Sequence, residues 1–268
     1  MAGRLVALDL PSGPDFIEEL QRIWANGDAA FPVDQRFPEL AKQQACAAMR
    51  VGADVEPGDA LVVATSGSTG SPKGVILTHD AVAASAEATS MRLGVDAGDH
   101  WLACLPLSHV GGLSVVTRAL HTGTALTALP VFDAAAVDAS DANLISLVAT
   151  ALTRIDTTKF RTIVLGGGRP PAGRPTNAVT TYGLTETGSG VVYDGIPLNG
   201  VEVEIDGDHE IALRGPMLTR GYRNGQSPVT GNGWLLTGDL GHWTAGGQLH
   251  VEGRKGDLII CGGENIWP

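Results

Sequence analysis

Residues 65–74 of the chain read Thr65-Ser66-Gly67-Ser68-Thr69-Gly70-Ser71-Pro72-Lys73-Gly74. The three glycines allow the backbone to fold closely around an anion, the five hydroxyl side chains add hydrogen-bond donors, and Lys73 adds a mobile positive charge. A flexible Gly/Ser linker has a similar composition. This segment, however, lies between two apolar, strand-like segments, Ala60–Ala64 and Val75–Thr78. We therefore predict a phosphate-binding loop between two strands.

A loop of the P-loop NTPase type is the obvious alternative. That pattern requires Gly-Lys-Ser/Thr at the point where a helix begins. Here Pro72 precedes Lys73, Gly74 follows it, and the next residues favour a strand. The sequence therefore argues against a P-loop NTPase.

Strands and helices alternate on both sides of the loop, which predicts an α/β sheet. Thr78 or Asp80 is expected to cap a helix that runs to about Met91. The other predicted strands cover residues 101–105, 125–129 and 162–165, and the other predicted helices cover residues 14–23, 38–49, 112–120 and 144–152.

The apolar pattern changes after about residue 195. Val201, Val203 and Ile205 alternate with two glutamates, which is the period of a half-buried strand. We therefore predict an α/β region over residues 1–195, a β-rich subdomain over 196–253 and a hinge segment over 254–268.

Composition and charge narrow the classes of function. Hydrophobic residues make up 43% and charged residues 18%, which is ordinary for a globular protein. The net charge of −11 argues against a nucleic-acid or anionic-membrane surface. The three cysteines form no CxxC pair, which favours reduced thiols over disulfides. No apolar run reaches the length of about 18–20 residues that a membrane span needs. We expect a cytoplasmic protein that binds neither nucleic acid nor membrane.

The loop at residues 65–74 resembles the phosphate-binding signature of the adenylate-forming (AMP-binding) superfamily, which contains acyl-CoA synthetases, peptide-synthetase adenylation domains and luciferases. Four further segments resemble later motifs of that superfamily, in the same order along the chain. They are Tyr182-Gly183-Leu184-Thr185-Glu186, the stretch 195–203 with its continuation 215–221, Trp234-Leu235-Leu236-Thr237-Gly238-Asp239, and residues 253–260. The resemblance spans residues 60–268. It implies the α/β N-terminal domain of an adenylate-forming enzyme, with shortened sheet layers and a β-rich, barrel-like subdomain.

The resemblance also implies a reaction. A carboxylate attacks the α-phosphorus of ATP, pyrophosphate leaves, and the acyl group passes to coenzyme A. Thr185 would contact the α-phosphate, and Glu186 would bind Mg²⁺, a hard cation that prefers one or two carboxylates with phosphate and water. Together with Lys73 and His109, these two residues form the catalytic set that the resemblance implies.

The implied nucleotide site is larger. Tyr182 would line the adenine, the backbone of 166–168 would lie along the ring, and Asp239, with Arg254 nearby, would accept hydrogen bonds from the ribose hydroxyls. The full set comprises Thr65, Ser66, Gly67, Ser68, Thr69, Gly70, Lys73, Gly166, Gly167, Gly168, Thr181, Tyr182, Gly183, Thr185, Asp239 and Arg254. Taken singly, such a tyrosine is more often a core aromatic, and such an aspartate a turn residue.

His109 lies in a segment, 105–113, that is similar to the Pro-Leu-x-His-x-x-Gly motif of acyl- and aryl-CoA synthetases. The resemblance places His109 where the acyl carboxylate meets the α-phosphate. A lone histidine is more often structural, but the glycine pair Gly111-Gly112 would permit close approach of a ligand. We therefore expect His109 to be a site residue.

The acid is suggested by two features. Only 64 residues precede Thr65, and such a short N-terminal portion is typical of the o-succinylbenzoate–CoA ligases of menaquinone synthesis. The runs 105–118 and 189–198 also look like those of these ligases. That acid is a dicarboxylate, so its non-reacting carboxylate needs a partner. Arg118 is the candidate, although a helical arginine is more often exposed or ion-paired. Thr180 and Ser189 are further candidates to line the acyl pocket.

Several alternatives stay open. The chain could be another short acyl- or aryl-CoA ligase, a non-catalytic nucleotide-binding homologue or a peptide-synthetase adenylation domain. The last normally has an aspartate near residue 107, where this chain has Leu107. The family's catalytic lysine lies in a C-terminal lid domain of roughly a hundred residues, which we expect to be absent from residues 1–268, with catalysis impaired as a result. A homodimer is left open.

Overall fold

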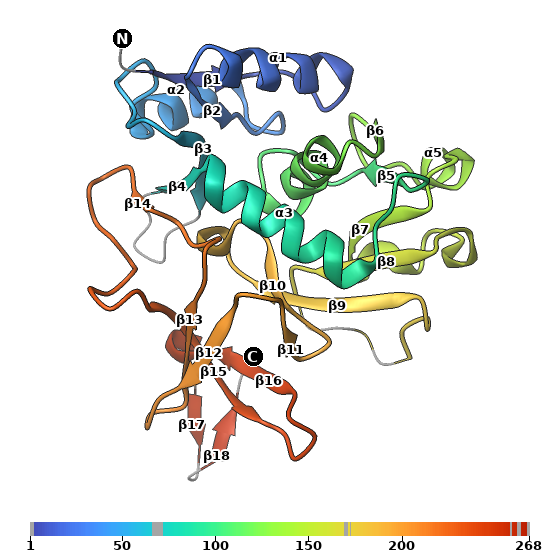
Figure 1. The fold of residues 1–268 in the computed structure, drawn as a ribbon, viewed down its shortest axis with the longest axis vertical. Helices are drawn as coiled ribbons and strands as arrows, with labels where there is room; N and C mark the ends of the chain where they lie inside the picture. The colour runs from blue at the N-terminus through green and yellow to red at the C-terminus, as the bar shows by residue number, and fades with distance from the viewer. Residues whose placement is uncertain are drawn as a thin grey trace.

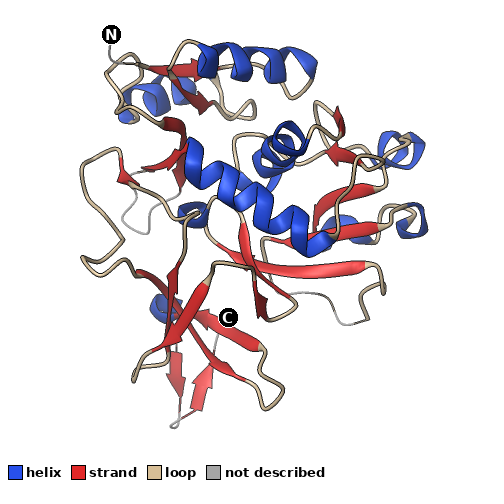
Figure 2. Cartoon of the chain, in the orientation of Figure 1, coloured by secondary structure: helices blue, strands red, loops and turns tan. Residues whose placement is uncertain are grey.

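The computed structural model describes residues 3–65, 72–168, 171, 173–257, 259–261 and 264–266. The predicted nucleotide contacts Ser66, Gly67, Ser68, Thr69 and Gly70 lie outside the described residues. Two larger sheets stand above a smaller antiparallel sheet in the view of Figure 1, and helices lie between and around them (Figure 2).

The first sheet has the order β1-β2-β3-β4-β14 and contains the two strands on either side of the predicted phosphate loop. Its strands are β1 Leu5–Leu8, β2 Ala29–Pro32, β3 Asp59–Thr65, β4 Lys73–Thr78 and β14 Gly221–Tyr222. The antiparallel pair β3 and β4 brackets the loop, as predicted, because Thr65 pairs with Lys73. The short β14 returns from far along the chain to pair with β4. Helices α1 Pro14–Ala25 and α2 Glu39–Ala48 belong to this part of the chain.

The second sheet has the order β11-β10-β9-β8-β7-β5-β6. Its strands are β5 His100–Ala103, β6 Ala125–Ala128, β7 Leu144–Val148, β8 Thr162–Gly166, β9 Ala178–Gly183, β10 Gly190–Tyr193 and β11 Ile196–Pro197. Five neighbouring strands of this sheet, β6, β5, β7, β8 and β9, are parallel, so their carboxyl ends meet at one edge. In open α/β sheets that edge is where ligands bind.

Helices α3 His79–Leu93 and α4 Val110–Thr122 connect the two sheets through one apolar core. The helix α3 contacts α4 as well as β3, β4 and β10, and Figure 1 shows it crossing the middle of the molecule. Its N-cap is Thr78, whose Oγ1 accepts a hydrogen bond from the Ala81 amide at 3.1 Å, so that prediction is confirmed. The shorter helices are α5 Ala134–Ala139 and α6 Ala149–Leu152, with 3₁₀ turns η1 Thr157–Lys159, η2 Thr185–Thr187 and η3 Lys255–Asp257.

The predicted helix over residues 144–152 is wrong. Residues 144–148 form β7, between β5 and β8, and only the last four residues are helical. Both faces of β7 are covered, so four of its five residues are apolar and they do not alternate with polar residues. Such a run cannot be distinguished from a buried helix by periodicity alone.

The third sheet confirms the predicted change of period. Its order is β12-β13-β15-β16, all antiparallel, with β12 Glu202–Ile205, β13 Glu210–Arg214, β15 Leu235–Trp243 and β16 Leu249–Arg254. The strands β17 Ile259–Cys261 and β18 Glu264–Ile266 form a separate pair beneath it in Figure 1. Among the described residues, no helix combines the length and the apolar character needed to cross a membrane.

Candidate active site

A cleft of about 1830 Å³ opens where the first, second and third sheets approach one another. Its wall includes the carboxyl ends of β7, β8 and β9, the start of α4, the inner side of α2, and Asp239 and Arg254 of the third sheet. Ordinary ligand pockets measure about 300–1,000 Å³. The cleft therefore has room for more than one ligand.

Asp239 and Arg254 face each other because β15 and β16 pair in that register. The guanidinium Nε of Arg254 lies 3.0 Å from Oδ1 of Asp239, and the Tyr182 hydroxyl donates to Oδ2 at 2.9 Å. Burial raises the pKa of the Asp239 carboxyl, an effect that Arg254 and Tyr182 oppose. The structure thus brings together three of the residues expected at the nucleotide, although Tyr182 itself is not among the lining side chains.

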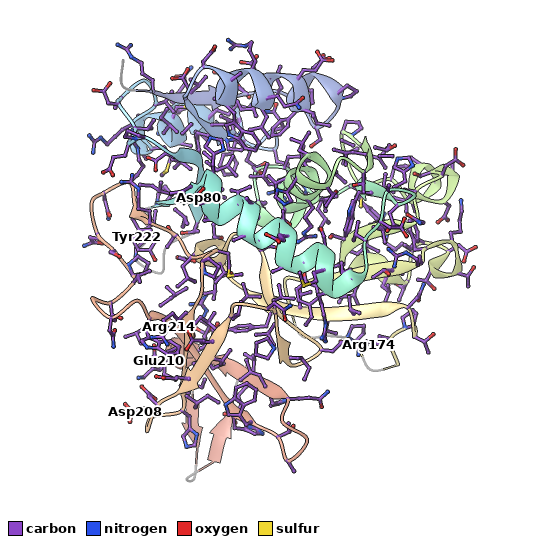
Figure 3. All side chains as sticks on the ribbon, in the orientation of Figure 1. Asp80, Arg174, Asp208, Glu210, Arg214 and Tyr222 are labelled. Carbon is purple, nitrogen blue, oxygen red and sulfur yellow. The ribbon has the colours of Figure 1, made fainter. Side chains whose placement is uncertain are left out.

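A second group gathers around Glu186, in the turn η2 that follows β9. The hydroxyl of Tyr222 donates to Oε1 of Glu186 at 2.8 Å, and the Lys73 ammonium lies 5.0 Å from the centroid of the Tyr222 ring. The pairing of β14 with β4 places Tyr222 there (Figure 3). Sequence reasoning missed Tyr222, although the family-like stretch 215–221 ends one residue before it.

Arg118 lies deep in the cleft wall and is only 2% exposed. Its Nη2 donates to the hydroxyl oxygens of Ser114, at 3.0 Å, and Ser189, and its guanidinium carbon lies 5.5 Å from the centroid of the Trp101 ring. Within the described part of the chain, its Nε and Nη1 have no hydrogen-bond partner. Burial lowers its pKa. Arg118 is therefore not exposed and has no ion-pair partner among the described residues, and a buried cation without a counter-charge is costly.

The hydroxyl of Ser146, on β7, is another buried polar group of the cleft that lacks a hydrogen-bond partner among the described residues. Sequence reasoning missed Ser146 because it interrupts an apolar strand without any motif around it. Together with Arg118 it leaves unsatisfied donors at the same cleft, a feature that in proteins calls for a ligand or ordered water.

The predicted site residues divide into those that line the cleft and those that do not. The residues that line the cleft are Thr65, Lys73, His109, Arg118, Gly166, Gly167, Thr181, Gly183, Thr185, Glu186, Ser189, Asp239 and Arg254. Gly168 and Thr180 are not among the lining residues. The Thr180 hydroxyl and amide both donate to Asp194, which pairs with Arg174. The side chain of Thr180 thus binds Asp194 and does not line the cleft.

His109 is the N-cap residue of α4 and lines the cleft. At the glycine pair after it, the structure shows a constraint that is separate from the predicted approach of a ligand. A Cβ on Gly112 would lie 2.4 Å from the carbonyl oxygen of Leu105 and 2.6 Å from that of Pro106. Gly112 is therefore required by the chain's own backbone, whereas a Cβ on Gly111 would meet only the Leu105 side chain, at 3.7 Å.

The fold of the chain matches that of known adenylate-forming enzymes. The chain belongs to the family of AMP-binding enzymes, whose sequence profile, described as "AMP-binding enzyme", matches residues 13–223. The prediction of the family and of its fold is confirmed.

Two curated relatives carry the name of one ligase. The chain is 37% identical over 250 residues to a 2-succinylbenzoate–CoA ligase from Bacillus anthracis, a match that covers 77% of this chain and 52% of that protein. It is 36% identical over 298 residues to a probable 2-succinylbenzoate–CoA ligase from Mycobacterium tuberculosis, covering 100% of this chain and 74% of that protein. The chain thus spans about half the length of the first relative and about three quarters of the second.

Solved structures agree with these relatives. The o-succinylbenzoate CoA synthetase from Bacillus subtilis, in complex with its acyl-adenylate intermediate, superposes with a TM-score of 0.87 at 26% identity over all of this chain and 71% of that chain. The same enzyme in complex with ATP and magnesium ion gives a TM-score of 0.73 at 30% identity, over 94% of this chain and 64% of that chain.

Proposed function

We propose that the chain forms the nucleotide- and acyl-binding part of an AMP-forming acid–CoA ligase whose acid is o-succinylbenzoate. The observation that carries the proposal is Arg118, a buried guanidinium with unpaired N–H groups in a cleft large enough for a nucleotide and an acyl group. The names of the curated relatives support the same acid.

In this proposal the nucleotide lies between Asp239 and Glu186. The Asp239 carboxylate accepts hydrogen bonds from the ribose hydroxyls, with Arg254 beside it, and Thr185 contacts the α-phosphate. Negative charge builds up on the phosphate oxygens as the carboxylate attacks and pyrophosphate leaves. Positioning and fixed positive charge, including that of Lys73, therefore supply most of the catalysis.

Glu186 fits the role of a Mg²⁺ ligand because it is a carboxylate that faces the cleft and is oriented by the Tyr222 hydroxyl. Mg²⁺ accepts one or two carboxylates with phosphate oxygens and water completing its shell. When bound, the ion would neutralise part of the charge on the phosphates. Lys73, beside the Tyr222 ring, would add to that effect.

At the acyl end, Arg118 and Ser189 hold the non-reacting carboxylate of the acid. Burying that carboxylate unpaired would cost several kcal/mol, so the pocket needs a charged donor. Ser146 lies at the same cleft and adds a hydroxyl. His109 meets the reacting carboxylate at the start of α4. Transfer to coenzyme A follows, and we propose that the reaction takes place in the cytoplasm.

We also propose that residues 1–195, 196–253 and 254–268 act as the α/β region, the β-rich subdomain and the hinge segment. The separate antiparallel sheet of β12, β13, β15 and β16 supports the second of these. The strand β14 is an exception to this division, because it lies beyond residue 195 in the sequence but pairs with β4 of the first sheet.

A thermal-shift panel of sulfamoyl-adenosine analogues of acyl adenylates tests the proposal. The analogues would carry o-succinylbenzoyl, benzoyl, acetyl or octanoyl groups at equal concentration. A ligand that binds only the folded state adds RT ln(1 + [L]/Kd), about 2.7 kcal/mol at a hundred times Kd. We expect the o-succinylbenzoyl compound to raise Tm most. A larger shift with a monocarboxylic analogue would refute the acid, and no shift with any compound would refute the nucleotide site.

A further inference from the structure

Arg36 lies in the segment between β2 and α2 and is held in place by Asp34. Its Nε donates to Oδ1 of Asp34 at 2.9 Å and its Nη2 to Oδ2 at 2.5 Å, a side-on bidentate pair. The Arg36 amide also donates to Oδ1, at 3.0 Å. These hydrogen bonds hold the pKa of the buried Asp34 carboxyl well below its usual range. The guanidinium is thus oriented by a fixed counter-charge.

The same guanidinium reaches His109, 73 residues further along the chain. Arg36 Nη2 lies 2.7 Å from Nε2 of His109. A guanidinium has donors but no acceptor, so a hydrogen bond of this length requires Nε2 to be the acceptor. A neutral imidazole that accepts at Nε2 carries its proton on Nδ1.

The charged groups around His109 also oppose an imidazolium. Its N-cap position puts it at the positive end of the α4 dipole. Partial desolvation by the cleft wall and the charge of Arg36 lower its pKa, although its side chain is 54% exposed, and Asp34 only partly opposes them. Oδ2 of Asp34 is 3.4 Å from Nε2, longer than a good hydrogen bond. Protonation would place two donors face to face across the Arg36 contact.

We propose that Arg36, oriented by Asp34, is a positioning residue that fixes His109 as the neutral tautomer protonated on Nδ1. His109 then offers an Nδ1–H donor to a ligand oxygen in the cleft. On the function proposed above, that oxygen belongs to the reacting carboxylate. A neutral donor orients the carboxylate without transferring a proton to it, so the carboxylate keeps its nucleophilic charge. An imidazolium would form an ion pair and weaken the nucleophile.

Long-range ¹H–¹⁵N correlation spectra of the ligand-free protein test this proposal. The chain has seven histidines, and the pattern that disappears in His109→Gln assigns His109. We expect the Nδ1–H tautomer in the wild type at pH 7.5. In Arg36→Gln we expect the Nε2–H tautomer to appear and the imidazole to titrate at higher pH. Arg22→Gln is the matched control because Arg22 forms an exposed ion pair with Glu19, and it should leave the His109 signals unchanged.

Arg36→Gln should also weaken binding of the o-succinylbenzoyl sulfamoyl-adenosine about three- to tenfold, the worth of one neutral hydrogen bond. The proposal is overturned if wild-type His109 is the Nε2–H tautomer or an imidazolium at pH 7.5, a result that needs no variant to fold. It is also overturned if Arg36→Gln keeps the Nδ1–H tautomer. Because the spectra contain no ligand, this failure is distinguishable from failure of the proposed function, which the analogue panel measures.

Discussion

Arg118→Met should lower the affinity for the o-succinylbenzoyl sulfamoyl-adenosine by about a hundredfold or more. The substitution leaves the free carboxylate of the ligand buried without its charged partner, and losing one partner of a buried pair costs about 3–5 kcal/mol. Methionine fills much of the arginine's volume, so the wall of the cleft stays packed. Calorimetric titration at fixed pH and salt measures the loss.

The same variant separates a binding role from a structural one. Two buried nitrogens of Arg118 have no hydrogen-bond partner among the described residues, and exchanging a buried charge for an apolar side chain is often neutral or stabilising. We therefore expect Tm to stay the same or rise. Substitution of Arg92, a helical arginine of α3, is the matched control. Arg92 lies outside the cleft and donates to the Tyr193 carbonyl oxygen at 3.1 Å. If Arg118→Met lost stability but kept its affinity for the analogue, Arg118 would be structural.

Asp239→Ala should weaken AMP binding about ten- to a hundredfold. The substitution removes a charged acceptor from the ribose hydroxyls, and a hydrogen bond to a charged group contributes about 1.5–3 kcal/mol. Asp206→Ala is the control: Asp206 belongs to the exposed turn between β12 and β13 of the same sheet and should not affect the affinity.

The pH dependence of AMP binding gives an independent check on Asp239. Burial raises the pKa of its carboxyl, so the group gains a proton at a higher pH than an ordinary aspartate. Protonation removes the negative charge and turns one acceptor oxygen into a donor, so wild-type affinity should fall as the pH is lowered through that raised pKa. Asp239→Ala should lack this decrease. A variant with wild-type affinity at every pH would mean that Asp239 has only a structural role in β15.

Much of the fold could be predicted because local patterns and long-range packing agree. The alternation of strands with helices, the Thr78 cap and the period of two after residue 195 are all properties of short segments. The failure at residues 144–148 is of another kind. The strand conformation of these residues depends on pairing with β5 and β8, which lie far from them in the sequence, and no local pattern encodes that pairing.

The site residues follow the same division. Glu186 and Asp239 lie within motifs, whereas Tyr222 and Arg36 reach the site through contacts 36 and 73 residues apart in the chain. Tyr222 depends on the pairing of β14 with β4, which a two-residue strand does not reveal. Gly112 was predicted to permit the approach of a ligand. The carbonyl oxygens of Leu105 and Pro106, which leave no room for a Cβ there, come close only in the folded chain and could not be predicted.

The most direct test is the affinity of the wild-type protein for two ligands that differ at one group. One is the o-succinylbenzoyl sulfamoyl-adenosine, and the other is the same compound with a neutral amide in place of its free carboxylate. If Arg118 holds that carboxylate, calorimetry should find the acid bound at least about a hundredfold more tightly than the amide, the consequence of leaving a buried charge unpaired. Equal affinities would contradict the proposal that Arg118 binds the free carboxylate, because the cleft would then bind the adenylate without any contribution from that carboxylate.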